Sequence, residues 1–88
     1  MKEAKKIDDF RTQLENHYNF PTNYLFKFIV PQEQVEKLKS LLPQGKISTK
    51  KSRTGKYVGV SFNLLAKSSH EIIDIYKEVY MIKGIISL

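Results

Sequence analysis

In the predicted strand of residues 56–64, the side chains from residue 57 onward alternate between two sets, one apolar and one mostly polar, and this alternation constrains the fold more than any other feature of the chain. The residues of one parity are Val58, Val60, Phe62 and Leu64, and those between them are Tyr57, Gly59, Ser61 and Asn63. A period of two residues is typical of a β-strand that buries one face and exposes the other. The chain is therefore expected to form a sheet that is covered on one side.

Three further segments have the composition of strands. Residues 24–30 are aromatic and β-branched on both faces, which suits a central strand. Residues 45–53 are polar and basic, and Thr54-Gly55 after them is a plausible hairpin turn into the alternating strand. Residues 83–88 form the last predicted strand.

Three segments have the apolar spacing of amphipathic helices. The first covers residues 3–18, where Ile7, Phe10 and Leu14 recur every three or four positions. The second covers residues 31–42. The third begins after Ser68, which with Glu71 forms the capping-box pattern of a helix N-terminus.

The resulting order is one helix followed by β-α-β-β-α-β. Short connections and right-handed crossovers favour the ferredoxin-like split βαβ arrangement within the α+β class. Its four-stranded antiparallel sheet has the order 4-1-3-2, with the two later helices on one face. The 88 residues make one folded unit, which we divide into an N-terminal amphipathic helix (residues 1–19) and a ferredoxin-like domain (residues 20–88).

Positive charge is concentrated in one part of the chain. The whole sequence has 15 Lys and Arg against 9 Asp and Glu, a net charge of +6, yet residues 39–67 hold seven cations and no acid. The candidate anion-binding or partner-binding residues are Lys46, Lys50, Lys51, Arg53 and Lys56. A patch of this kind attracts nucleic acid, a nucleotide or an acidic partner. Lysines also protect the edge strands of sheets from aggregation, and the two interpretations are compatible.

The predicted uncovered face of the sheet offers a second candidate surface. Its interaction residues are Leu25, Ile29, Tyr57 and Ile85. The N-terminal helix is a candidate cover for this apolar patch, within one chain or across a dimer. RNA-recognition sheets stack bases on two or three exposed aromatic rings, and here only Tyr57 is available, which makes an RNA module the weaker interpretation.

The chain lacks the residue patterns of common catalytic and metal sites. It has no cysteine, and His17 and His70 lie far apart in sequence without a ligand partner at helical spacing. No nucleophile-elbow, zinc-protease or phosphate-loop motif is present. We therefore expect a non-enzymatic protein without a cofactor or metal. No segment has the apolar length of a membrane span or signal peptide, so a cytoplasmic protein is expected.

Residues 20–88 resemble the bacterial YbeD-like family, a domain of unknown function sometimes labelled a lipoic acid regulatory protein. The resemblance rests on Phe20-Pro21-Thr22 before a strand that contains Lys27, and on Ser52-x-x-Gly55-x-Tyr57-x-x-Val60-Ser61 across the hairpin. It implies a ferredoxin-like fold similar to ACT regulatory domains, which bind small effectors.

The sequence thus predicts a regulatory or interaction module that works through a protein partner or self-association. A small anionic effector near the basic strand is a further expectation. The alternative function is nucleic-acid binding through the same lysines and arginine.

Overall fold

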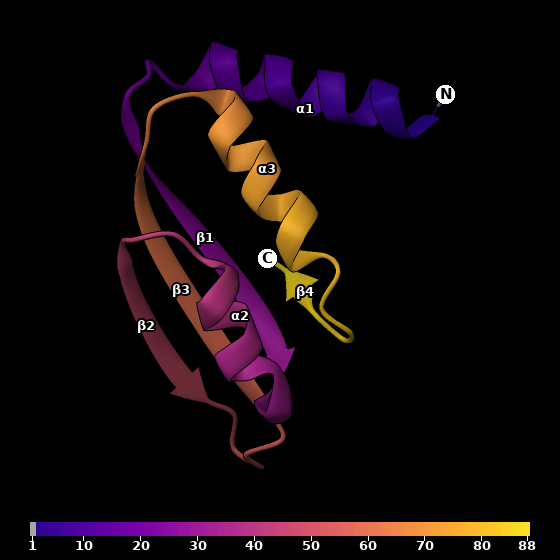
Figure 1. Ribbon diagram of the computed structural model, residues 1–88, viewed down its shortest axis with the longest axis vertical. Coiled ribbons are helices and arrows are strands. Elements are labelled where there is room, and N and C mark those ends of the chain that lie inside the picture. Colours follow the sequence, from indigo (N-terminus) through magenta and orange to yellow (C-terminus); the bar gives the residue numbers. More distant parts are fainter. Residues whose placement is uncertain (1) are drawn as a thin grey trace.

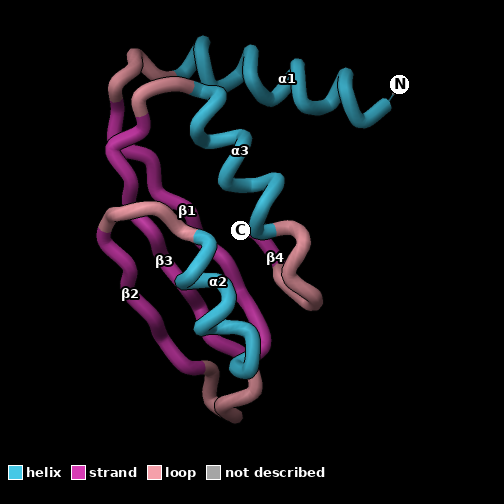
Figure 2. Tube along the Cα trace, viewed as in Figure 1, coloured by secondary structure: helices cyan, strands magenta, loops and turns pink. Residues whose placement is uncertain are grey.

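The computed structural model describes residues 2–88 and shows one four-stranded sheet with helices packed on one side (Figures 1 and 2). The strands lie in the order β2-β3-β1-β4, and all neighbouring pairs are antiparallel. This order is the predicted 4-1-3-2, and the ferredoxin-like prediction is confirmed. The elements are α1 (Lys2–His17), β1 (Thr22–Pro31), the short 3-10 helix η1 (Gln32–Gln34), α2 (Val35–Leu41), β2 (Lys46–Lys51), β3 (Tyr57–Ala66), α3 (Ser69–Val79) and β4 (Ile86–Ser87).

The centre of the sheet is the pair β1 and β3. Phe26 lies opposite Phe62, and Phe28 lies opposite Val60. Residues that are paired in an antiparallel ladder have side chains on the same face, so these four side chains form one apolar row. Each is at most 1% exposed. The prediction that these two segments build the middle of the sheet is confirmed.

Helices α2 and α3 cover this apolar row. Leu38 of α2 and Ile72 and Val79 of α3 are completely buried against it. The Ser68 side chain accepts a hydrogen bond from the backbone N–H of Glu71 (3.3 Å), as the capping pattern predicts. The Glu71 carboxylate, however, accepts from the N–H of Lys67 rather than of Ser68 (3.4 Å).

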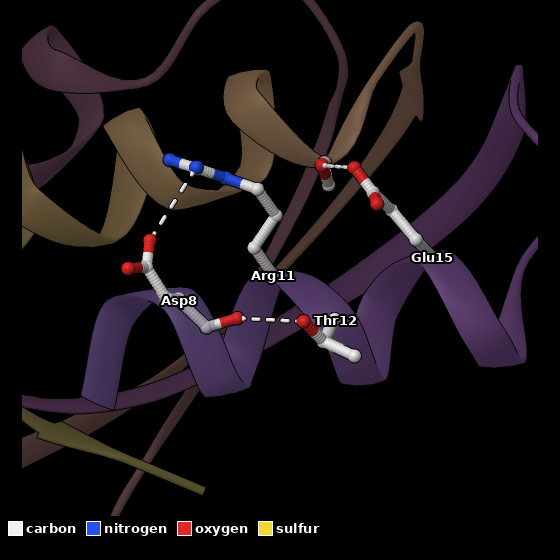
Figure 3. Close-up of polar contacts among 5 residues, drawn as sticks. Asp8, Arg11, Thr12 and Glu15 are labelled. Atoms are coloured by element: carbon white, nitrogen blue, oxygen red, sulfur yellow. Dashed lines mark hydrogen bonds and ion pairs between the residues drawn. The ribbon is translucent and has the colours of Figure 1, made fainter. Parts of the chain in front are cut away.

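Helix α1 packs on the helical side of the molecule, against α3. Its Leu14 is 3% exposed, and its Glu15 carboxylate accepts a hydrogen bond from the Ser69 hydroxyl at 2.9 Å. Figure 3 shows Glu15 directed toward α3, whereas Asp8 interacts with Arg11 and Thr12 along α1 itself. The alternative in which this helix covers the other sheet face of its own chain is therefore wrong, because its apolar stripe packs on the helical side, where α1 contacts α3.

Strand β4 is shorter than predicted, and the residues that face the uncovered side of the sheet are the even-numbered ones instead of the odd-numbered ones. Ile86 lies opposite Ile29 and Ser87 opposite Phe28. Ile86 is therefore on the uncovered face, and Ile85 packs at the border of the core, which contradicts the predicted position of Ile85. The cause is the turn that precedes β4, in which Gly84 has φ +83° and the strand begins later than expected.

None of the helices in residues 2–88 combines the length and the apolar character that crossing a bilayer requires.

Candidate functional site

The sheet face that the helices leave uncovered is the main candidate site, and we call it the open face. Its members follow from the register of the four strands, because alternate residues of each strand share one side. They are Asn23, Leu25, Lys27, Ile29 and Pro31 of β1, Tyr57, Gly59, Ser61, Asn63 and Leu65 of β3, Lys46, Ser48 and Lys50 of β2, and Ile86 of β4. Leu25, Ile29 and Tyr57 thus lie where the sequence predicts, and Ile86 replaces Ile85.

The predicted basic residues all belong to the β2–β3 hairpin, which we call the basic edge. Strand β2 is the terminal strand of the sheet, and all six of its residues are exposed. Arg53 and Lys56 lie in the connecting turn, which is closed by a hydrogen bond from the N–H of Ser52 to the carbonyl of Tyr57 (2.8 Å). Gly55 has φ +76° there, a backbone conformation that glycine adopts without strain.

The five predicted cations do not all lie on one face. Lys46 and Lys50 are opposite Asn63 and Gly59, on the open face, whereas Lys51 is opposite the buried Val58 and belongs to the helical side. Lys27 of the neighbouring central strand is exposed and joins Lys46 and Lys50. The sequence predicts Lys27 on this face, but Lys27 was not among the candidate binding residues. Its parity with Leu25 and Ile29 in the strand was enough to place it beside the lysines of β2.

The two kinds of charge are separated by element. All nine acidic residues of the chain lie within the bounds of helices, and none lies in a strand. The strands contain four lysines, namely Lys27, Lys46, Lys50 and Lys51. The charged side chains of the strands are therefore all positive, and their potential favours the approach of anions.

A shallow hollow of about 320 Å³ lies at the middle of the open face. Gly59 forms part of it, and a Cβ atom at this position would have only the Lys50 carbonyl oxygen within 4 Å, at 3.6 Å. Ser48 and Ser61 are directly opposite each other across β2 and β3, and Lys27 and Lys50 flank them. Hydroxyl and ammonium groups are hydrogen-bond donors, so this arrangement suits a carboxylate or phosphate oxygen.

Apolar side chains border the cationic part of the open face. Leu25 is 49% exposed, Tyr57 47% and Ile86 53%. Tyr57 is the one aromatic residue among the open-face members defined above. The surface thus combines lysines and exposed aliphatic groups with a single aromatic ring, whereas base-stacking platforms present several rings.

The described residues show no cluster of metal-ligating groups. No three His, Asp or Glu side chains within them come together as ligands for an ion. His70 interacts with Asp74 at 3.1 Å on the exposed side of α3.

The fold and this surface define an α+β protein with a ferredoxin-like sheet, one uncovered face and a basic edge. The chain belongs to the family described as protein of unknown function (DUF493), the YbeD family, whose model matches residues 15–87. Neither the curated proteins nor the solved structures gave a match.

Proposed function

We propose that the protein is a non-enzymatic interaction module that binds an acidic protein partner with its open face and basic edge. The observation that carries this proposal is the separation of charge, with lysines in the sheet and every acid on a helix. Charge complementarity steers association and selects partners. The exposed Leu25, Tyr57 and Ile86 supply the apolar contacts that a stable protein interface also needs.

An acidic partner fits this surface better than a second copy of the chain does. Pairing of β2 with the β2 of another copy would place the lysines of the two strands against each other. Like charges that face each other across strands are destabilising, and lysine-rich edges are known to discourage such pairing. A partner segment with alternating acidic and apolar residues meets both requirements.

Regulation by a small effector is the second part of the proposal, and the backbone limits where such a site can lie. At the end of β1, Pro31 has no N–H to donate, and the N–H of Gln32 already donates to the carbonyl of Lys56 (3.0 Å). An effector site of the ACT type at this turn therefore lacks both donors. Any effector that acts on this protein binds elsewhere, and the proposed setting of the interaction is the cytoplasm.

The test is an NMR titration with an extended peptide of about fourteen residues that alternates Glu with Val. The backbone amide signals of β2, β3 and the hollow around Gly59 are expected to shift. A Lys46→Glu/Lys50→Glu variant should weaken binding at least about tenfold, since each exposed ion pair contributes up to about 1 kcal/mol. Lys37→Glu, which makes the same charge change on α2, should leave binding within about twofold.

Two outcomes would contradict the proposal. One is a titration in which only amide signals of the helical side shift, or in which the Lys46→Glu/Lys50→Glu and Lys37→Glu variants bind the peptide with equal affinity. The other is a stable dimer in light scattering whose interface protects the open face.

Nucleic-acid binding remains the second candidate function, favoured by the five cations of one hairpin. Its test is the affinity for a single-stranded oligouridine at about 50 and 200 mM salt. Phosphate contacts lower the logarithm of affinity by about 0.7 per contact for each logarithmic unit of salt on single strands. Binding to RNA that is tighter than binding to the peptide, with such a slope, would favour this function over the first.

A further inference from the structure

A second concave site is lined by residues of α1, β1 and α3 and by Ser87 and Leu88 at the end of the chain. Figure 1 shows where α1, α3 and β4 lie relative to one another. The volume of this site is about 500 Å³, within the range of about 300–1,000 Å³ that is typical of small-molecule sites. Ile7, Phe10 and Ile73 make its apolar wall. We call it the α1–α3 cleft.

Aromatic rings dominate the lining of the α1–α3 cleft. Tyr76 is the central ring, with Phe10 edge-on at 5.6 Å and Tyr80 stacked at 5.8 Å between ring centroids. Tyr24 completes the group, with an interplanar angle of 87° to Tyr76. Rings in these arrangements favour a further aromatic ring as their neighbour.

Two tyrosine hydroxyls provide a polar group inside this aromatic lining. The hydroxyls of Tyr24 and Tyr76 are 3.0 Å apart and share one hydrogen bond. The Ser87 side chain also hydrogen-bonds with Tyr76. Two tyrosine hydroxyls carry two hydrogens, and a ligand oxygen can accept the one that the shared bond does not use. Burial, and then the hydrogen bond to Tyr24, raises the pKa of Tyr76 far above its usual value, which keeps this group protonated.

The charged side chains that line the cleft are both cations, and the lining also includes Leu88, the last residue of the sequence. Lys6 of α1 and Lys77 of α3 are members of the lining, which contains no Asp or Glu side chain. A carboxylate therefore finds two ammonium groups and a hydroxyl donor, whereas an ammonium group on a ligand finds no acidic side chain.

We propose that the α1–α3 cleft binds a small aromatic monocarboxylate that lacks an amino group. The ring of the ligand lies among Phe10, Tyr76 and Tyr80, and its carboxylate is held by Lys6, Lys77 and the tyrosine hydroxyl pair. This inference does not depend on the open face, because the linings of the cleft and of the hollow share no residue except Leu88.

The probe is hydrocinnamate, a phenyl ring joined to a carboxylate by two methylene groups. In an NMR titration up to about 20 mM, we expect shifts at Ile73, Tyr76, Tyr80 and Ser87, with a dissociation constant on the order of 1–10 mM for a ligand of this size. Phenylalanine, which adds an ammonium group, and the neutral hydrocinnamide should each bind at least about fivefold more weakly.

Two substitutions separate the contacts of the carboxylate from the integrity of the fold. Tyr76→Phe keeps the ring and removes one hydroxyl, and it should weaken hydrocinnamate binding about tenfold. Lys77→Gln should weaken binding about threefold. Lys27→Gln on the open face is the matched control and should have no effect.

The proposal is overturned by the absence of shifts at 20 mM or by shifts centred on Gly59 and Ser61. It is also overturned if phenylalanine or the amide binds as well as the acid, or if Tyr76→Phe and Lys77→Gln retain full affinity while the spectrum shows an intact fold.

Discussion

The two faces of the sheet differ in what their side chains do, although they share one backbone. On the helical side, Phe26 and Phe62 are completely buried, and removal of either leaves a cavity. On the open face, the alternate residues of the same strands, such as Leu25 and Lys27, are exposed. The comparison teaches that one face determines stability, whereas the other can be changed without unfolding the protein and is therefore available for binding.

The largest expected effect tests the helical side. Phe62→Ala should lower the free energy of unfolding by about 3–5 kcal/mol, because it removes a ring from the centre of the core. Its neighbour Asn63 belongs to the open face and is exposed, so Asn63→Ala should change stability by at most about 0.5 kcal/mol. Equilibrium urea unfolding of both variants measures the difference. Equal losses would show that the two faces do not divide stability as described.

The second test asks whether α1 belongs to the same cooperative unit. Leu14→Ala should cost about 2–4 kcal/mol, because Leu14 is 3% exposed on the helical side. Thr12, whose hydroxyl donates only to the carbonyl of Asp8 one turn earlier, is the control, and Thr12→Ala should cost much less. An unchanged unfolding midpoint for Leu14→Ala would mean that α1 is not docked.

Two glycines, Gly45 packed against β3 and Gly59 within β3, are expected to differ in what an added methyl group does to stability. A Cβ atom at Gly45 would lie 2.5 Å from the Phe62 ring and 2.8 Å from the Asn63 carbonyl oxygen, so Gly45→Ala should cost about 1–3 kcal/mol. Gly59→Ala meets only an ordinary contact and should be neutral or stabilise by up to about 1 kcal/mol. Because the added methyl group enters the hollow, Gly59→Ala should still lower the affinity for the acidic peptide. Thermal unfolding and the peptide titration together decide this prediction.

The smallest effect concerns pH. The pKa of Tyr76 is raised from its ordinary value of 10.0 by burial and by the Tyr24 hydroxyl. The folded state therefore holds this proton more tightly than the unfolded state does. The corresponding stability is fully present below about pH 10 and is lost as the pH rises further. Urea unfolding between pH 8 and about 11 should show a weaker pH dependence for Tyr76→Phe than for the natural chain. Tyr57→Phe, on the exposed face, should not differ from the natural chain.

The sequence was sufficient to predict what depends on local pattern. The parity of Val58 and Phe62 identified the buried side of β3, and the polar, basic composition of residues 45–53 identified the edge strand. The position of β4 was predicted one residue out of phase, because the turn at Gly84 and its contact with Pro31 depend on tertiary packing. The docking of α1 was missed for the same reason, since an amphipathic stripe does not specify which surface it covers.

The two candidate sites also differ in whether local sequence pattern or tertiary packing determines them. The open face could be listed from strand parity, apart from Ile86. The α1–α3 cleft could not be predicted, because Phe10, Tyr24, Tyr76 and Ser87 come from four different elements that only the folded chain brings together.

The account is tested most directly by measuring stability and binding on the same protein, the Lys46→Glu/Lys50→Glu variant. We predict a free energy of unfolding within about 0.5 kcal/mol of the natural chain, together with at least a tenfold loss of affinity for the acidic peptide. Undiminished peptide affinity in a folded variant, or a loss of affinity that merely follows a loss of stability, would contradict the assignment of binding to the open face.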